Sequence, residues 1–334
     1  MTQTETVQNI NKNNEKCDEV KKHIPVLLKE VLACLAPQEN AVYVDGTLGL
    51  GGYTRGILDH TDCDVIAIDR DETVFKDAQN WSKNYEGRLT LIHGSFSDIE
   101  QHIKVAGDKA ADGVDGIVVD IGVSSMQIDE AERGFSFRFE GPLDMRMDQT
   151  SGHTAADIVN TMDETELANL IYEYGEERHS RKIAAEIIRT RAHTKFATTK
   201  DLTDAIHRVI PKHFKDKIDP ATRTFQALRI AVNDELGELE KLLTAAKDIL
   251  KVNGRLVVVT FHSLEDRIVK NFINELCKKP PSPSRYAPQN DDTFEPRFRM
   301  INKKPIIASD HEIKQNPRAR SAKLRAIEKI KVCA

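Results

Sequence analysis

The sequence predicts an α/β protein with a doubly wound, mostly parallel sheet and an inserted helical domain. Five short runs are almost continuously apolar, as in strands that helices cover on both faces. They are Ala41–Asp45, Asp64–Asp69, Leu89–His93, Gly116–Asp120 and Arg255–Phe261. The first four begin 23, 25 and 27 residues apart, the length of one strand–helix unit, whereas the fifth begins 139 residues after the fourth. One helix cannot fill that last gap, so the spacing predicts an insertion there.

The long gap after the fourth run is predicted to hold helices. Periodicity and capping residues predict them over Glu164–Tyr174 with a stop at Gly175, over Ser180–Ala192, and from Thr199 to Ile210 before Pro211. After Pro220 one long helix is expected, since apolar residues recur at helical spacing. They are Phe225, Leu228, Val232, Leu236, Leu239 and Leu243. That helix leads through the turn signal Asn253-Gly254 into the fifth strand.

Length and composition indicate how the chain is divided. A chain of 334 residues is too long for one compact core. We expect a sheet domain made of residues 23–129 and 221–334, and an inserted helical substrate-recognition domain made of residues 130–220. Residues 1–22 are polar and contain no apolar h-region, so they are predicted to be a disordered tail and not a secretory signal. Residues 279–292, rich in Pro, Ser, Asn and Asp, are expected to form an exposed loop.

Composition also bears on the compartment. No apolar run approaches the ~20 residues of a membrane span, and 30% of the residues are charged. We therefore expect a soluble protein. The five cysteines are an odd number and none lies in a C-x-x-C pair, which favours the reducing cytoplasm and indicates neither a disulfide framework nor a metal site. The sequence leaves the oligomeric state open, with a homodimer among the alternatives.

Charge is spread unevenly along the chain. The formal net charge is -5, but residues 297–331 hold 11 Lys or Arg and three acids, which gives 11 - 3 = +8. A basic segment in an acidic chain is a weak indication of a polyanionic partner.

A glycine-rich loop, Asp45–Gly52, follows the first predicted strand, and a helix is expected to begin near Tyr53. Glycines let a ligand approach the backbone, and a helix N-terminus favours negative charge. The dinucleotide pattern G-x-G-x-x-G fails, because Thr54 stands where its last glycine belongs. The loop is better matched by the E/D-x-G-x-G-x-G loops of methyltransferases, so we expect S-adenosylmethionine as the cofactor.

Acidic and aromatic residues follow the other predicted strands. Asp69 ends the second strand, where a carboxylate can accept hydrogen bonds from both ribose hydroxyls of a nucleoside. Phe96 follows the third strand and either flanks the adenine or packs in the core. Asp120 ends the fourth strand, where methyltransferases that act on amino nitrogens place an acidic residue, although the prolines usual after it are absent.

Nine strings in the sequence resemble the ribosomal RNA small-subunit methyltransferase H family, also called MraW, over roughly residues 22–327. The strings are His23–Leu28, Asp45–Gly52, Asp120–Gln127, Glu132–Phe137, Gly141–Asp148, Tyr174–Arg178, Pro220–Arg229, Phe261–Arg267 and Asn316–Arg320. The resemblance implies a class I S-adenosylmethionine methyltransferase fold. It also implies methylation of the N4 amino group of a cytidine in the decoding region of small-subunit ribosomal RNA.

The resemblance further implies the cofactor contacts. Those positions are Gly51, Gly52, Tyr53, Asp69, Phe96, Asp120 and Gln127. The chain departs from the family twice, with Tyr53 where the family usually has His and with Met126 where it usually has Pro. The first departure puts a side-chain contact at position 53 in doubt, and the second loosens the loop before Gln127.

Several residues are candidates for the chemistry and for RNA contacts. Asp120 is the leading candidate to accept a hydrogen bond from the reacting amine, with cofactor binding alone as the alternative. The candidates for RNA binding are Arg133, Arg138, Arg146, Arg223, Arg229, His262, Arg318 and Arg320. For each arginine a salt-bridged structural role is an equal alternative, and for His262 a capping role is favoured. Phe135, Phe137 and Phe139 are expected to anchor the insertion, with base stacking as the alternative.

Two other functions stay open at this point. One is methylation of a different acceptor, such as DNA or a small molecule. The other is a cofactor-binding ribosome-assembly factor without catalysis. The presence of both Asp69 and Asp120 counts against the second.

Overall fold

A computed structural model describes residues 25–213, 218–278 and 295–331. The predicted disordered tail at 1–22 and the predicted loop at 279–292 lie outside these residues. Within them, no helix is both long and apolar enough to cross a membrane.

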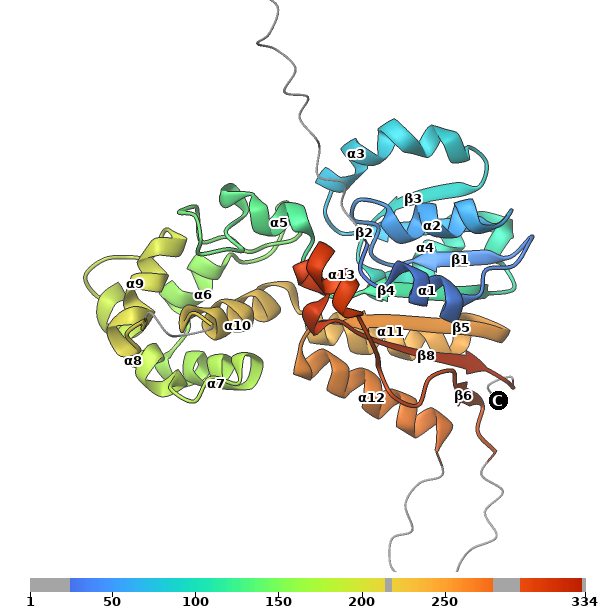
Figure 1. The fold of residues 1–334 in the computed structure, drawn as a ribbon. Helices are drawn as coiled ribbons and strands as arrows, with labels where there is room; N and C mark the ends of the chain where they lie inside the picture. The colour runs from blue at the N-terminus through green and yellow to red at the C-terminus, as the bar shows by residue number, and fades with distance from the viewer. Residues whose placement is uncertain (1–24, 214–217, 279–294, 332–334) are drawn as a thin grey trace, which may run out of the picture.

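An eight-stranded sheet forms the centre of the larger part of the molecule (Figure 1). Its strands are β1 Val42–Asp45, β2 Asp64–Asp69, β3 Leu89–His93, β4 Val114–Asp120, β5 Leu250–Thr260, β6 Phe298–Met300, β7 Ile306–Ile307 and β8 Lys323–Lys329. The order is β3-β2-β1-β4-β5-β8-β6, and β7 pairs with β8. Strands β1 to β5 run parallel, and β8 pairs antiparallel with β5. The predicted doubly wound, mostly parallel sheet is confirmed.

Helices cover both faces of this sheet, which explains why its strands are apolar throughout. They are α1 Leu28–Leu35, α2 Gly52–His60, α3 Thr73–Trp81, α4 Ile99–Val105, α11 Glu235–Ile249 and α12 Ser263–Cys277, with α5 Ser125–Asp129 and α13 Asp310–Gln315 near the carboxyl edge. Successive strand residues point to opposite faces: Tyr43 packs with α1 and α2, whereas Val42 and Val44 pack with α4, α11 and α12. Burial on both faces accounts for the absence of alternation in the sequence.

A separate helical lobe stands beside the sheet (Figure 1). It consists of α6 Ala155–Thr161, α7 Glu164–Gly175, α8 Ser180–Arg191, α9 Thr199–Val209 and α10 Ala221–Asn233, which share a core of their own. Phe135 and Phe137 pack against this core, and the Phe137 ring meets Phe225 edge-on with centroids 5.0 Å apart. The anchoring role fits these two aromatics, whereas the Phe139 side chain is 56% exposed.

The predicted single helix after Pro220 is wrong. It is two helices, α10 and α11, separated at Asp234, whose φ of 47° is left-handed and ends α10. The apolar stripe continues across the break, so the sequence pattern could not reveal it. Helix α10 packs in the core of the helical lobe, whereas the division expected at residue 220 assigned it to the sheet domain. The predicted turn at Asn253-Gly254 lies within β5, where the register with β4 shifts.

The basic segment 297–331 is largely built into the sheet. Glu328 on β8 accepts from Arg255 and Arg299, and Asp266 on α12 accepts from Arg325. The Lys329 ammonium is buried and donates to the carbonyls of Lys247 and Leu250. Several basic residues of this segment therefore have partners inside the fold.

Candidate active site

A cavity of about 410 Å³ opens at the carboxyl ends of β1 and β4. The strand order reverses between these two strands, and such switch points are where open α/β sheets bind ligands. The glycine loop, Asp69, Phe96 and residues 120–124 line one part of the cavity. Residues from α10, the start of α11, the end of β5 and residues 316–321 line the other part. Its volume is in the range typical of small-molecule sites.

The glycine loop needs glycine at particular positions. Gly51 has φ +74°, and a Cβ there would lie 2.2 Å from the Trp81 ring. A Cβ on Gly52 would lie 2.3 Å from the Pro25 side chain. The loop is therefore packed tightly from behind, with Gly51 in the cap of α2. Gly52 lines the cavity and Gly51 does not.

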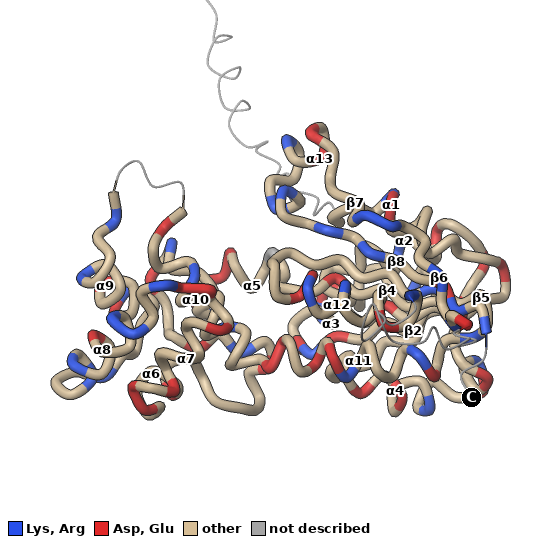
Figure 2. The backbone as a smooth tube through the Cα atoms, turned by 90° about the horizontal axis from the view of Figure 1, so that it is seen from below, with Lys and Arg blue, Asp and Glu red and all other residues tan. Residues whose placement is uncertain are grey.

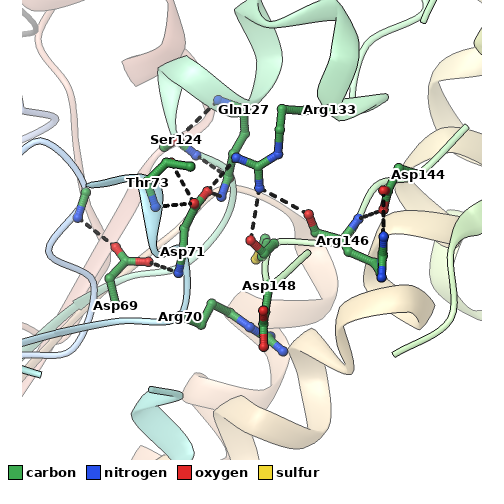
Figure 3. A network of polar contacts seen from close by, with 12 residues as sticks. Asp69, Arg70, Asp71, Thr73, Ser124, Gln127, Arg133, Asp144, Arg146 and Asp148 are labelled. Atoms are coloured by element: carbon green, nitrogen blue, oxygen red, sulfur yellow. Dashed lines mark hydrogen bonds and ion pairs between the residues drawn. The ribbon is translucent and has the colours of Figure 1, made fainter. Parts of the chain in front are cut away.

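Asp69 connects the end of β2 to the glycine loop (Figure 3). Its Oδ2 accepts from the Gly49 amide at 2.8 Å, and its Oδ1 accepts from the Asp71 amide at 2.9 Å. Burial raises the pKa of Asp69 to about 6, although these two amides oppose that rise. Each oxygen keeps a lone pair, so the carboxylate can still accept from the two hydroxyls of a ribose.

Asp120 ends β4 in the wall of the cavity. Its amide donates to Thr47 Oγ1 at 2.8 Å, but its buried Oδ1 has no hydrogen-bond partner among the described residues. Burial, followed by the charges of Asp45 and Glu265, raises the pKa of Asp120 well above its usual value. Buried acceptors without partners are costly, so this carboxylate is suited to a donor that a ligand brings.

Gln127 lies beside the cavity in a buried network centred on Asp71 (Figure 3). Its Oε1 accepts from the Ser124 amide, and its Nε2 donates to Asp71 Oδ2 at 2.9 Å. Arg133 Nη1 donates to the same oxygen at 2.8 Å. The Gln127 side chain is thus engaged within the protein and holds the loop after β4 against the loop after β2.

Tyr53 and Phe96, the two predicted aromatic contacts, both line the cavity. The Tyr53 side chain is only 4% exposed, and its hydroxyl donates to the Val26 carbonyl at 2.5 Å. This geometry therefore disfavours a contact between the Tyr53 side chain and a cofactor. The backbone of Tyr53 lies in the first turn of α2. Phe96 begins a short 3-10 helix and packs partly against the core of the sheet.

The eight residues predicted to contact RNA differ in exposure and in their partners. Arg138, Arg223 and Arg320 are exposed, whereas Arg146 bonds Asp144 and Arg318 bonds Asp129. The prediction is wrong for Arg133, because its guanidinium is buried and pairs with Asp71, which keeps it from any phosphate. Arg229, His262 and Arg318 line the cavity.

His262 is the N-cap of α12, in a capping box with Glu265. Its Nδ1 accepts from the Glu265 amide at 3.5 Å, and its Nε2 lies 2.6 Å from Glu265 Oε1. Both ring nitrogens therefore face Glu265, which favours the capping role over the predicted RNA contact.

The cavity residues that the sequence reasoning did not single out include Gln226, Glu235 and Phe261. Gln226 and Phe261 lie within strings that carry the family resemblance, which was the available signal. Ligand atoms of Glu235, His262 and Glu265 lie within 4.8 Å of one another. Both Glu235 oxygens accept from Arg229, and Glu265 Oε2 accepts from the Phe261 and His262 amides, so we assign no metal to this group.

Comparison with known proteins gives consistent matches over nearly the whole chain. The sequence profile of the MraW methylase family matches residues 20–330. A protein of Rhodospirillum rubrum named "Ribosomal RNA small subunit methyltransferase H" is 51% identical over 92% of this chain and 94% of its own length. A protein of the same name from a Wolbachia of Drosophila simulans is 52% identical over 92% and 99%. Among solved structures, a protein from Streptococcus mutans in complex with SAH has 13% identity and a TM-score of 0.40, over 92% of this chain and 100% of its own.

Proposed function

The chain belongs to the MraW methylase family, and from this premise we propose that it methylates N4 of a cytidine in the P site of the decoding region of small-subunit ribosomal RNA. Its cofactor is S-adenosylmethionine, which supplies an electrophilic methyl group when bound. That the acceptor is small-subunit ribosomal RNA follows from the relatives' names, whereas the cytidine and its N4 atom are the finer part of the proposal.

The observation that carries the proposal is that the buried Oδ1 of Asp120 has no hydrogen-bond partner in the part of the chain that the structure describes. The exocyclic amine of cytosine is a weak nucleophile because its lone pair is delocalised into the ring. An acceptor fixed beside the amine orients it toward the methyl group and stabilises the positive charge that develops on nitrogen. Asp120 Oδ1 is such an acceptor, and the Thr47 hydroxyl holds the backbone of Asp120 in place. The proton that the amine loses passes to Asp120 or to water.

The residues on the other side of the cavity mouth fit the cofactor. Asp69 receives the ribose hydroxyls, the glycine loop leaves space for the amino-acid part, and Phe96 lies against the adenine. Asp69 and Asp120, the two acids at the strand ends in the cavity lining, favour a cofactor that carries a positively charged sulfonium.

The target base must leave its stack to reach this cavity, which costs a few kcal/mol. Exposed basic residues offer phosphate contacts that offset this cost. Figure 2 shows Lys and Arg on α8 and α9 of the helical lobe, and in the segment around α13. Arg138, Arg223 and Arg320, which are exposed, are the predicted contacts best placed for phosphate.

A tritium-transfer assay tests the proposal. Purified protein and labelled S-adenosylmethionine are incubated with unmethylated small ribosomal subunits, with free ribosomal RNA and with DNA. Label in one cytidine of the subunit, recovered as N4-methylcytidine, is the expected result. Label in DNA alone indicates a different acceptor, and cofactor binding without transfer indicates an assembly factor; either result refutes the proposal.

A further inference from the structure

Arg229 and Glu235 form a rigid pair in the wall of the cavity. Arg229 Nε donates to Glu235 Oε1 at 2.7 Å, and Arg229 Nη2 donates to Glu235 Oε2 at 2.8 Å. The side chains are 16% and 4% exposed. The left-handed Asp234 between α10 and α11 places Glu235 against Arg229, because an unbroken helix would carry the two residues, six positions apart, to different faces.

This bidentate pairing uses two of the three guanidinium nitrogens. The third, Nη1, has no acceptor among the described residues. A guanidinium is planar, so fixing Nε and Nη2 also fixes the direction of the two Nη1 protons. The cavity wall therefore holds a positioned donor in Arg229 and a positioned acceptor in Asp120, and the Glu265 carboxylate acts electrostatically on both.

The edge of a cytosine matches a donor and an acceptor held in one cavity. Its N4 amino group donates, and its N3 and O2 accept. Uracil reverses this order at two positions, because its O4 accepts and its N3–H donates. Bringing uracil into such a site would leave Asp120 without a partner and set the N3–H of the base against the guanidinium, and sites built on buried polar groups reject such ligands strongly.

We propose that Arg229 is a specificity-determining residue that donates from Nη1 to N3 and O2 of the target cytosine, and that Glu235 is the positioning residue that aims it. This assignment rests on the proposed function. It differs from the phosphate contact expected from the sequence, because the guanidinium lies in the cavity wall with an internal counterion.

The experiment measures base discrimination as the ratio of the affinity for normal subunits to the affinity for subunits with uridine at the target position. Small ribosomal subunits that carry uridine in place of the methyl-accepting cytidine compete with normal unmethylated subunits in the tritium-transfer assay. For the unaltered protein, the normal subunit is expected to bind about 10- to 100-fold better, the range of one good base contact. Arg229→Lys and Glu235→Gln are expected to lower this ratio by about fivefold or more, with the part that Asp120 supplies remaining, while calorimetry shows unchanged affinity for SAH.

Two further variants keep the test decisive. Arg229→Met combined with Glu235→Met removes both buried charges together, which proteins tolerate better than the loss of one. Arg255→Met is the matched control. Arg255 also pairs with a buried glutamate, Glu328, but it lies outside the cavity. The control is expected to keep the ratio of the unaltered protein.

The outcomes separate the two proposals. An unchanged ratio in a folded Arg229 variant that binds SAH overturns the role of Arg229. If the ratio changes in Arg229→Lys but stays the same in Glu235→Gln, the positioning role of Glu235 is overturned. Absence of transfer by the unaltered protein is instead a failure of the proposed function.

Discussion

Arg133 and Asp71, which lie 62 positions apart in the chain, form a buried ion pair beside the cavity, with Arg133 Nη1 2.8 Å from Asp71 Oδ2 (Figure 3). Their side chains are 4% and 3% exposed. Arg133 Nη2 also donates to the carbonyls of Arg146 and Met147. Burial alone would raise the pKa of Asp71, but hydrogen bonds from Thr73, Gln127 and Arg133 hold it below its usual value. The pair ties the start of the inserted region to the loop that follows Asp69.

Replacing Arg133 by Ala is expected to destabilise the protein by about 3–5 kcal/mol, because it leaves the Asp71 charge buried with fewer partners. Urea denaturation measures the free energy of unfolding. Lys200→Ala is the control, since the Lys200–Asp204 pair is exposed and should contribute no measurable stability. Equal effects of the two substitutions would contradict the role assigned to the buried pair.

Replacing Asp69 by Ala is expected to weaken binding of S-adenosylmethionine, because the ribose hydroxyls lose their acceptor. The ionised carboxylate is the better acceptor and its pKa in the free protein is about 6, so affinity should fall as the pH is lowered through 6. Calorimetry between pH 5 and pH 8 tests both points. The Asp69→Ala variant should lose this pH dependence; if it persists, another group is responsible.

Replacing Asp120 by Asn is expected to lower the rate of methyl transfer about 100- to 1,000-fold, the range for removing one positioned electrostatic group. The same change should raise the melting temperature of the free protein at pH 7.5. The folded pKa of Asp120 is raised, so its contribution to stability is present below its unfolded pKa and is lost as the pH rises through the folded value.

The Asp120→Asn variant also separates the two roles left open for Asp120. Single-turnover transfer is compared with SAH affinity by calorimetry. A rate that falls much further than the affinity supports contact with the reacting amine. A parallel loss of both would leave Asp120 as a cofactor-binding residue alone.

Replacing Gly51 by Ala is expected to destabilise the protein and to weaken cofactor binding. The new Cβ would combine the strain of φ +74° with a 2.2 Å approach to the Trp81 ring. Gly107→Ala is a matched control, because Gly107 has φ +80° but nothing within 4 Å of an added Cβ. Thermal unfolding should show a larger loss for Gly51→Ala, and equal losses would mean that backbone strain alone matters.

Replacing Arg320 by Ala is expected to weaken binding to small ribosomal subunits and leave SAH affinity unchanged. Removing one phosphate contact should also lower the salt dependence of binding. Arg299→Ala, in the same basic segment, is the control because Arg299 already pairs with Glu328. Filter binding at several salt concentrations measures the effect, and a loss of SAH affinity in Arg320→Ala would refute the division of roles.

The sheet could be predicted because its signal is local. Each buried parallel strand is a continuous apolar run, and the regular spacing of the first four left room for one helix between them. The break at Asp234 could not be predicted, because the apolar stripe passes through it and the nearby glycine, Gly237, lies inside α11 and not at the break. The basic segment misled for a related reason, since β-pairing places Arg299 beside Glu328, and folding brings Asp266 of α12 to Arg325.

The sequence by itself determined the fold class, the glycine loop and the acids that end β2 and β4, because strand ends of a parallel sheet converge on one edge whatever the details of packing. Only the tertiary structure decided which polar side chains are free to meet a ligand. Gln127 Nε2 and Arg133 Nη1 donate to Asp71 within the protein, whereas Asp120 Oδ1 has no partner among the described residues. Whether a polar group has a partner depends on residues distant in the chain, and that information appears only when the chain has folded.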